Sequence, residues 1–227
     1  MPSLKSLVLL VEGEADVRAV PVLVKRLLTE QNAWGYLSLD PNPLRVAGIA
    51  NLTGRKAKNW TDKLRVATKR KNVGGVLLLL DGDVKASAGR SFCARLVSAD
   101  LSQRARAAGG GALFSVASVF ALQEFESWLI AGVDSLTGKN LPDGRPGIKA
   151  GIVVPGGDLE DAPRDAKGWL KKNMIAGYKE TADQQPLTEL VDLGAIRRRQ
   201  LRSFRRLENA IQQLVTAIRT GNHVVTP

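Results

Sequence analysis

Two short acidic segments follow two runs of aliphatic residues, and they are the part of the sequence best suited to chemistry. Glu12 and Asp16 come after the first run, and Asp81 and Asp83 come after the second. Several carboxylates in one place repel one another unless a cation neutralises them. Carboxylate oxygens are hard ligands, which favour Mg²⁺ or Mn²⁺, and one of these ions is the cofactor that we expect.

These acids need neighbouring strands to bring them together, and the pattern of residues 1–132 supplies such strands. The expected strands cover 5–11, 44–50, 76–80 and 112–120, and the expected helices cover 14–30, 57–71, 89–107 and 121–131. Aliphatic runs such as 76–80 are typical of strands buried on both faces of a parallel sheet. Alternation of strands and helices implies parallel pairing with right-handed crossovers. The sequence therefore predicts an α/β fold with a parallel four-stranded sheet between helices, and ligands collect at the carboxyl ends of such strands.

The composition changes after residue 132. Residues 132–168 are rich in glycine and proline and are expected to form a long loop or insertion with a helix near 163–174. A helix over 195–219 has an apolar face and an arginine-rich face. We expect residues 133–227 to form a loop-rich and helical extension that packs on the 1–132 core.

Positive charge is concentrated in two segments of this chain, whose formal net charge is +11. Residues 55–71 hold eight Lys or Arg against Asp62, and residues 193–227 hold seven Arg against Glu208. Dense basic segments bind phosphate backbones and other polyanions. DNA or RNA is therefore the expected partner, and an acidic protein is the alternative.

The rest of the composition excludes several classes of protein. No apolar run approaches the roughly 20 residues that cross a bilayer, so we expect no membrane association. The one cysteine cannot form an internal disulfide or a zinc cluster, which favours a reducing, cytoplasmic setting. The single histidine, His223, argues against a Ser-His-Asp triad.

The segments 11–16 (Val-Glu-Gly-Glu-Ala-Asp) and 81–83 (Asp-Gly-Asp) resemble the motifs of Toprim domains. In that family the first-strand glutamate and the D-x-D pair bind Mg²⁺, and the metal supports chemistry at a phosphodiester. The resemblance implies a Toprim-like, Rossmann-like sheet. It also implies catalytic and metal-binding roles for Glu12, Asp81 and Asp83, with Asp16 as a further metal ligand.

Three later segments extend the resemblance over nearly the full length. Residues 125–131, 178–181 and 203–207 are similar to a Toprim-like family of unknown function, DUF4276. This similarity implies that Glu126 is another metal ligand. It also makes Lys179, Arg205 and Arg206 candidates for phosphate binding. The ordinary alternatives are a solvated glutamate, a surface lysine and an exposed basic helix face.

Three functions fit these features. The first is a Mg²⁺-dependent nuclease of the Toprim type. The second is a non-catalytic Toprim-derived sensor, or a partner subunit of an ATPase-linked system. The third is a haloacid-dehalogenase-like phosphatase, because residues 80–84 match a D-x-D-x-[TV] motif. That motif normally lies on the first strand, whereas here it follows the third expected strand, and no later Asp-Asp pair is present.

Overall fold

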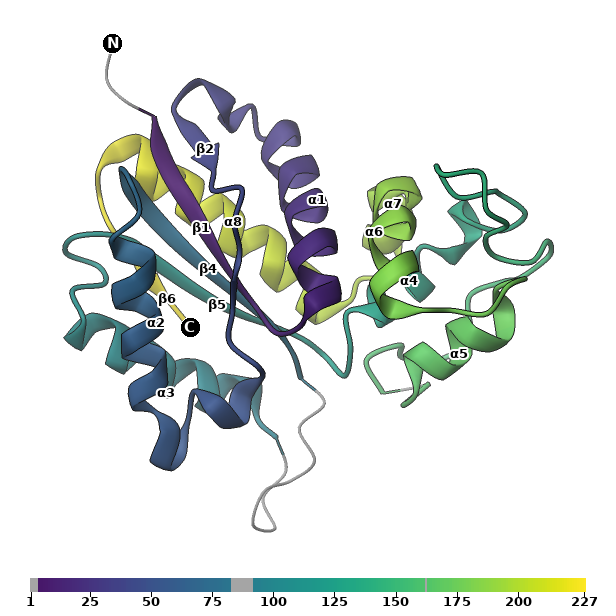
Figure 1. Ribbon diagram of the computed structural model, residues 1–227, viewed down its shortest axis with the longest axis horizontal. Helices are drawn as coiled ribbons and strands as arrows, with labels where there is room; N and C mark the ends of the chain where they lie inside the picture. Colours follow the sequence, from purple (N-terminus) through teal and green to yellow (C-terminus); the bar gives the residue numbers. More distant parts are fainter. Residues whose placement is uncertain (1–3, 83–91, 162) are drawn as a thin grey trace.

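A parallel sheet of six strands forms the centre of the protein, as the computed structural model of residues 4–82, 92–161 and 163–227 shows (Figure 1). The strands are β1 (Lys5–Val11), β2 (Leu37–Leu39), β3 (Leu44–Arg45), β4 (Val73–Asp81), β5 (Ser115–Ala121) and β6 (Val225–Thr226). Their order is β2-β1-β4-β5-β6, β3 pairs with β1, and every pairing is parallel. The predicted α/β class is confirmed.

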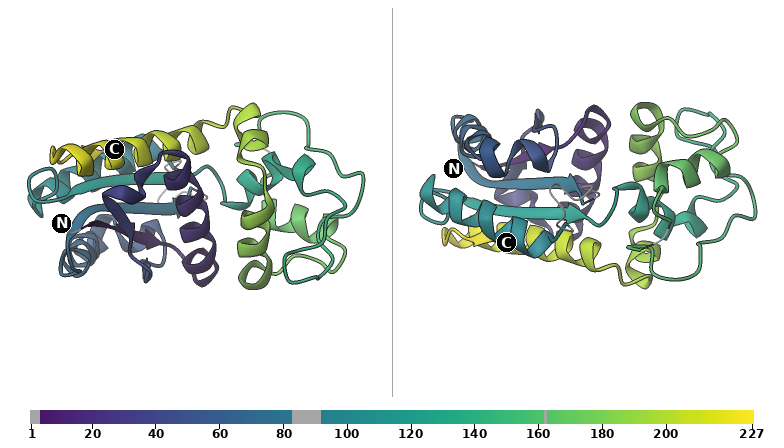
Figure 2. Two further views of the ribbon diagram at one scale, coloured as in Figure 1. Left: turned by 90° about the horizontal axis from the view of Figure 1, so that it is seen from above. Right: turned by 90° about the horizontal axis from the view of Figure 1, so that it is seen from below.

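Two pairs of helices cover the two faces of the sheet (Figure 2). Helices α1 (Glu14–Glu30) and α8 (Arg202–Thr220) lie on one face, and α2 (Lys58–Thr68) and α3 (Ala94–Ala107) lie on the other. Side chains alternate between faces along a strand. In β1, Leu7, Leu9 and Val11 face α1 and α8, while Val8 and Leu10 face α2 and α3.

The remaining helices form a second lobe beside the carboxyl ends of the strands (Figure 1). They are α4 (Glu126–Ala131), α5 (Ala166–Asn173), α6 (Glu180–Leu190) and α7 (Leu193–Arg198). Short 3-10 turns cover Ala33–Gly35, Ile49–Asn51, Gly54–Lys56 and Val133–Ser135. Trp128 of α4 is buried between the rings of Phe125 and Phe204, and its indole N–H donates to Ser203 Oγ at 2.9 Å. This contact joins the lobe to α8.

The expectation of four strands is wrong, because short strands carry no readable pattern. The expected strand 44–50 ends after Arg45, since Ala47 and Gly48 have positive φ angles of 55° and 85° and turn the chain. Strands β2 and β6, of three and two residues, complete the sheet. The expected helix 195–219 is broken between α7 and α8, where Gln200 has a φ of 54°.

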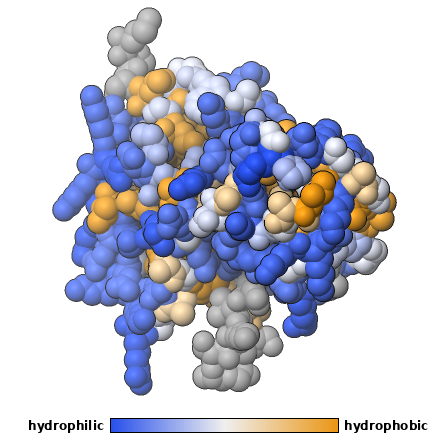
Figure 3. Space-filling view, turned by 45° about the vertical axis from the view of Figure 1, so that its right-hand side comes forward, coloured by the Kyte–Doolittle hydropathy of each residue, from blue (hydrophilic) through white to orange (hydrophobic). Residues whose placement is uncertain are grey.

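The division at residue 132 stays a prediction. After that point the chain returns to the sheet, because α8 packs on β5 and β6 pairs with it. Figure 3 shows the molecule with the second lobe turned toward the viewer. Hydrophilic side chains cover most of this face, and apolar residues lie in separate patches. No helix of the described residues has the length and apolar character needed to cross a membrane.

Candidate active site

Glu12 lies where β1 ends, directly beside the end of β4. Its Oε2 accepts a hydrogen bond from the backbone N–H of Asp81 at 3.2 Å. Gly48, in the loop after β3, lies against the other oxygen, since a Cβ there would come within 3.0 Å of Glu12 Oε1. Burial raises the pKa of Glu12, and the negative charge of Asp16 adds to this effect, while the Asp81 hydrogen bond opposes it.

Asp81 connects the end of β4 to the start of α4. Its Oδ1 accepts a hydrogen bond from the backbone N–H of Phe125 at 2.8 Å, and its Oδ2 lies 3.7 Å from Lys167 Nζ. Burial holds the pKa of Asp81 well above its usual range, and the neighbouring Glu126 carboxylate raises it further. The charged form of Asp81 is therefore unfavourable unless a cation lies close to it.

Glu126 is the most buried acid of the group, with 0% of its surface exposed. Its Oε1 accepts a hydrogen bond from the Tyr178 hydroxyl at 2.7 Å. Its Oε2 has no hydrogen-bond partner among the described residues and faces Lys167 Nζ at 3.9 Å. Burial raises the pKa of Glu126 to about 7, although Lys167 and Tyr178 oppose the shift. A solvated glutamate, one of the two interpretations of this position, is thus wrong.

Lys167 of α5 is the cation at the centre of these acids, and no motif or spacing in the sequence points to its role. Its Nζ lies 3.7 Å from Asp81, 3.5 Å from Glu124, 3.9 Å from Glu126 and 3.5 Å from Glu180. Burial by itself lowers the pKa of Lys167, but the carboxylates outweigh burial and raise the pKa above its ordinary value. The side chain is therefore a permanent ammonium group.

Asp16 is close to this centre but is occupied by structural contacts. Its Oδ2 accepts from the backbone N–H of Gly13 at 2.9 Å, which closes the first turn of α1. Its Oδ1 accepts from Gln184 Nε2 of α6 at 3.3 Å, and the side chain is buried. Asp16 therefore fixes α1 against α6, and its charge raises the pKa values of Glu12 and Asp81.

The carboxylates suit a hard divalent cation chemically, but they do not form a metal cage as they stand. Within residues 4–82, 92–161 and 163–227, no three acid, His or Cys side chains are gathered closely enough to hold a metal ion. Asp83, the second acid of the Asp-Gly-Asp segment, lies outside the described residues. The donors are nevertheless oxygens that favour Mg²⁺ or Mn²⁺, and one of them, Glu126 Oε2, is buried and receives no hydrogen bond from the part of the chain that the structure describes.

The site lies inside a region that known proteins share. Residues 11–212 match DUF4276, a domain of unknown function. The chain belongs to this family. The acidic centre consists of Lys167 and the acids around it, which are Glu12, Asp16, Asp81, Glu124, Glu126 and Glu180. All of these residues lie inside the matched region. No curated protein matches the chain.

The three basic candidates of the DUF4276 chain do not gather at the acidic centre. Lys179 is exposed at the start of α6 and forms no ion pair with the described acids. Arg205 is exposed on α8. Arg206 is half-buried on the same helix and donates to Thr226 Oγ1 at 2.9 Å. The lysine whose ammonium group lies among these carboxylates is thus Lys167 and not Lys179.

The two basic segments, 55–71 and 193–227, differ in how many of their side chains form ion pairs with acids of the same chain. In the arginine-rich segment, ion pairs with acids of the same chain engage Arg197, Arg198, Arg199 and Arg202. In segment 55–71, the described ion pairs involve only Arg65 and Arg70. The unengaged charge is thus denser on and around α2.

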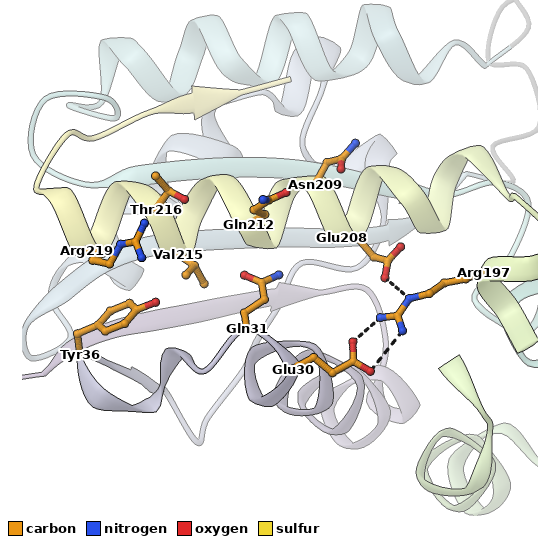
Figure 4. A pocket seen from close by; sticks show the side chains of 10 residues that line it. All are labelled: Glu30, Gln31, Tyr36, Arg197, Glu208, Asn209, Gln212, Val215, Thr216 and Arg219. Carbon is orange, nitrogen blue, oxygen red and sulfur yellow. Dashed lines mark hydrogen bonds and ion pairs between the residues drawn. The ribbon is translucent and has the colours of Figure 1, made fainter. Parts of the chain in front are cut away.

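A polar groove of about 540 Å³ lies between the end of α1 and α8 (Figure 4). Arg197 bridges Glu30 and Glu208 at one end of it. None of the residues predicted for catalysis or metal binding lines this groove, so it is separate from the acidic centre.

Proposed function

We propose that this protein performs Mg²⁺- or Mn²⁺-dependent chemistry on nucleic-acid phosphodiesters, as a nuclease of the Toprim type. The observation that carries the proposal is that Glu12 and Glu126 both lie near Asp81 at the carboxyl edge of a parallel sheet, and that one buried oxygen of Glu126 has no hydrogen-bond partner among the described residues. Acids with perturbed pKa values at the carboxyl ends of parallel strands are candidates for a functional site. The Toprim resemblance of residues 11–16 and 81–83 supports the same chemistry.

In this proposal the chain's own groups divide the work. A bound divalent cation would supply an activated water and would stabilise charge on the phosphate. Glu12 and Asp81 would hold the cation together with Asp83, and Asp16 and Glu126 would lie at the edge. Burial raises the pKa of Glu126 to about 7, which suits this side chain to carrying a proton near neutral pH. Lys167 is the group placed to donate to a phosphate oxygen, since its ammonium lies within 4 Å of both Asp81 and Glu126.

The non-catalytic alternative has one observation in its favour. Lys167 already neutralises part of the acidic centre and joins the second lobe to the sheet, so the cluster also works as a structural ion-pair network. In that case the protein acts as a sensor or as a subunit that needs a partner such as an ATPase.

Cleavage assays with matched variants test the proposal. Plasmid, single-stranded DNA and RNA are incubated with Mg²⁺, Mn²⁺ or EDTA, and bis-(p-nitrophenyl) phosphate and p-nitrophenyl phosphate separate diester from monoester chemistry. We expect metal-dependent diester cleavage that Asp81→Asn removes and that Asp100→Asn, which changes a partly exposed acid of α3 paired with Arg104, leaves intact. Cleavage by a folded Asp81→Asn protein contradicts the mechanism. Faster hydrolysis of the monoester supports the phosphatase.

The alternative makes the opposite prediction. If the protein neither cleaves any of these substrates nor gains melting temperature with Mg²⁺ or Mn²⁺, the acidic centre is structural. The interaction-subunit function then replaces the nuclease, since a ligand that binds only the folded state must stabilise it.

A further inference from the structure

A second pocket lies at the outer edge of β5, on the side of the sheet covered by α3. Strand β6 pairs only with Val116 and Ala117, so in the described residues the edge of β5 beyond this point has no strand partner. A pocket of about 330 Å³ opens there, a volume in the range of small-molecule sites. Its apolar surface comes from Ala94, Phe120 and Leu122.

Positive charge surrounds this apolar surface. Arg95, Arg202 and Arg206 line the pocket. Arg202 is engaged by Glu160, with Nε and Oε2 2.9 Å apart, whereas Arg95 and Arg206 form no ion pair with the described acids. Burial lowers the pKa of Arg206, whose partner among the described side chains is the neutral hydroxyl of Thr226 and not a carboxylate. An anion in the pocket offsets that cost.

The beginning of α3 adds to the positive potential. Ala94 and Arg95 are the first two residues of this 14-residue helix; its first turn contains no acid, and none of the described side chains caps it. Free N–H groups and the helix dipole make such an end favourable for phosphate. The start of α8 differs, since Glu160 Oε1 already accepts from the backbone N–H of Ser203 at 2.6 Å.

The pocket and the acidic centre lie on neighbouring strands. Leu122 follows Ala121, which is the register partner of Asp81, and the backbone N–H of Gly82 donates to the Ala121 carbonyl at 2.6 Å. Adjacent strands are about 4.8 Å apart. The backbones of the two places are therefore about one strand apart at this edge of the sheet.

We propose that this pocket binds one unpaired nucleotide, with its base against Phe120 and Leu122 and its phosphate against Arg95, Arg206 and the start of α3. The proposal deepens the proposed function, because it names the substrate as a single strand or an unpaired strand end. A base inside a duplex is stacked and paired and cannot enter such a pocket unless it is flipped out. Stacking on an aromatic ring accepts every base, so the pocket discriminates between unpaired and paired bases rather than between sequences.

Binding without metal tests the pocket separately from catalysis. Fluorescence anisotropy in EDTA compares a labelled single-stranded 12-mer with a hairpin duplex of related sequence. We expect the wild type to favour the single strand by at least about fivefold, the lower end of what one stacked base contributes. Arg206→Gln, Arg95→Gln and the pocket-filling Ala94→Leu should each reduce this preference. Arg205→Gln removes the same charge from an exposed position of the same helix and should lower both affinities equally.

The variants and a competitor define the outcomes. Equal wild-type affinity for the single strand and the duplex overturns the proposal, and so does an Arg95→Gln or Ala94→Leu protein that keeps the full preference. These two variants decide the matter if Arg206→Gln does not fold, as measured by circular dichroism. Competition by millimolar AMP shows that the pocket accepts a free nucleoside phosphate, and displacement only by oligonucleotides shows that it needs the strand.

The same measurements separate this proposal from the nuclease proposal. A preference for single strands that depends on Arg206, together with no cleavage under any metal condition, keeps the pocket and removes the nuclease. Metal-dependent cleavage together with equal binding of single strand and duplex keeps the nuclease and removes the pocket.

Discussion

Two regions at the carboxyl edge of the sheet, one strand apart, carry opposite uncompensated charge. Around Lys167, four carboxylates share one ammonium group. Around Arg206, cations line a pocket in which only Arg202 has an acidic partner among the described residues. The arginines 197–199 show the contrasting case, because each is paired with an acid of the same chain. Unbalanced charge near the sheet edge lowers stability, so its presence there favours function over architecture.

The largest effect should come from variants that change the acidic centre and leave the basic pocket intact. Asp81→Asn or Glu12→Gln should reduce metal-dependent cleavage by at least about 100-fold, more than the loss of groups that only orient metal ligands. Binding of single-stranded DNA in EDTA should stay within about twofold of the wild type, because the basic pocket is untouched. Cleavage rates and anisotropy on the same preparations measure both. Equal losses in binding and cleavage contradict a division between the regions.

The pH dependence of stability should report the excess charge of the acidic centre. The pKa of Glu126 is about 7 in the folded protein and 4.5 in the ordinary state, so between these values the folded state binds more protons than the unfolded state. The free energy of unfolding must therefore fall as the pH rises from about 4.5 to 7, by about 3 kcal/mol for the full shift. The raised pKa values of Asp81 and Glu12 act in the same direction, whereas that of Lys167 lies above this window.

Denaturant unfolding at several pH values measures this effect. The wild type should lose stability across the window, and Glu126→Gln should lose less, because the variant has no proton to release at this position. A variant with the same pH dependence as the wild type removes Glu126 as the source.

Removal of the Lys167 ammonium group should change the affinity of the neighbouring carboxylates for a divalent cation. Lys167→Gln leaves the carboxylates uncompensated, so we expect Mn²⁺ to bind about tenfold more tightly, equivalent to about 1.4 kcal/mol. Cleavage should fall, because the group placed to contact the phosphate is lost. Electron paramagnetic resonance of free Mn²⁺ gives the affinity, and Lys171→Gln, an exposed lysine of the same helix, is the control. Weaker Mn²⁺ binding by Lys167→Gln would mean that the lysine organises the ligands instead of competing with the metal.

The smallest expected effect is a difference in the salt dependence of DNA binding between variants in segment 55–71 and variants in segment 193–227. Lys58→Gln and Lys69→Gln change exposed residues without ion pairs to the described acids, and each should lower the slope of log affinity against log salt on duplex DNA by about 0.9 if it contacts a phosphate. Arg197→Gln and Arg199→Gln change arginines that are already paired, so their slopes should match the wild type. Salt titrations of duplex binding measure the slopes, and identical slopes for both pairs of variants would remove the distinction.

The parts of the fold that the sequence predicts are those with strong hydrophobic patterns. Strand 5–11 and helix 14–30 have the expected bounds, because one is buried on both faces and the other has a single apolar stripe. The proximity of Glu12 to Asp81 follows from the pairing of two parallel strands. Membership of the DUF4276 family, expected from three short segments, is confirmed.

The parts of the structure that the sequence does not predict have weak local patterns. Helix α6 contains Pro186 and few apolar residues, so its pattern does not indicate a helix. Lys167 belongs to a helix that was expected over 163–174, but nothing in the spacing shows that its side chain reaches acids from three other elements and a loop. Such a contact depends on tertiary packing, which local periodicity does not encode.

The return of α8 to the sheet has a consequence for how the chain acquires its fold during synthesis. Leu77 and Leu79 of β4 and Val119 of β5 face α8 and α1, and α8 begins about 80 residues after β5 ends. Pairing over such a separation is slow, because a long loop must close before the contact is made. A nascent chain that ends before residue 202 exposes an aliphatic sheet face, a surface that chaperones bind and that aggregates when unprotected. An isolated 1–132 fragment should therefore be insoluble, even though it contains Glu12, Asp81 and Glu126.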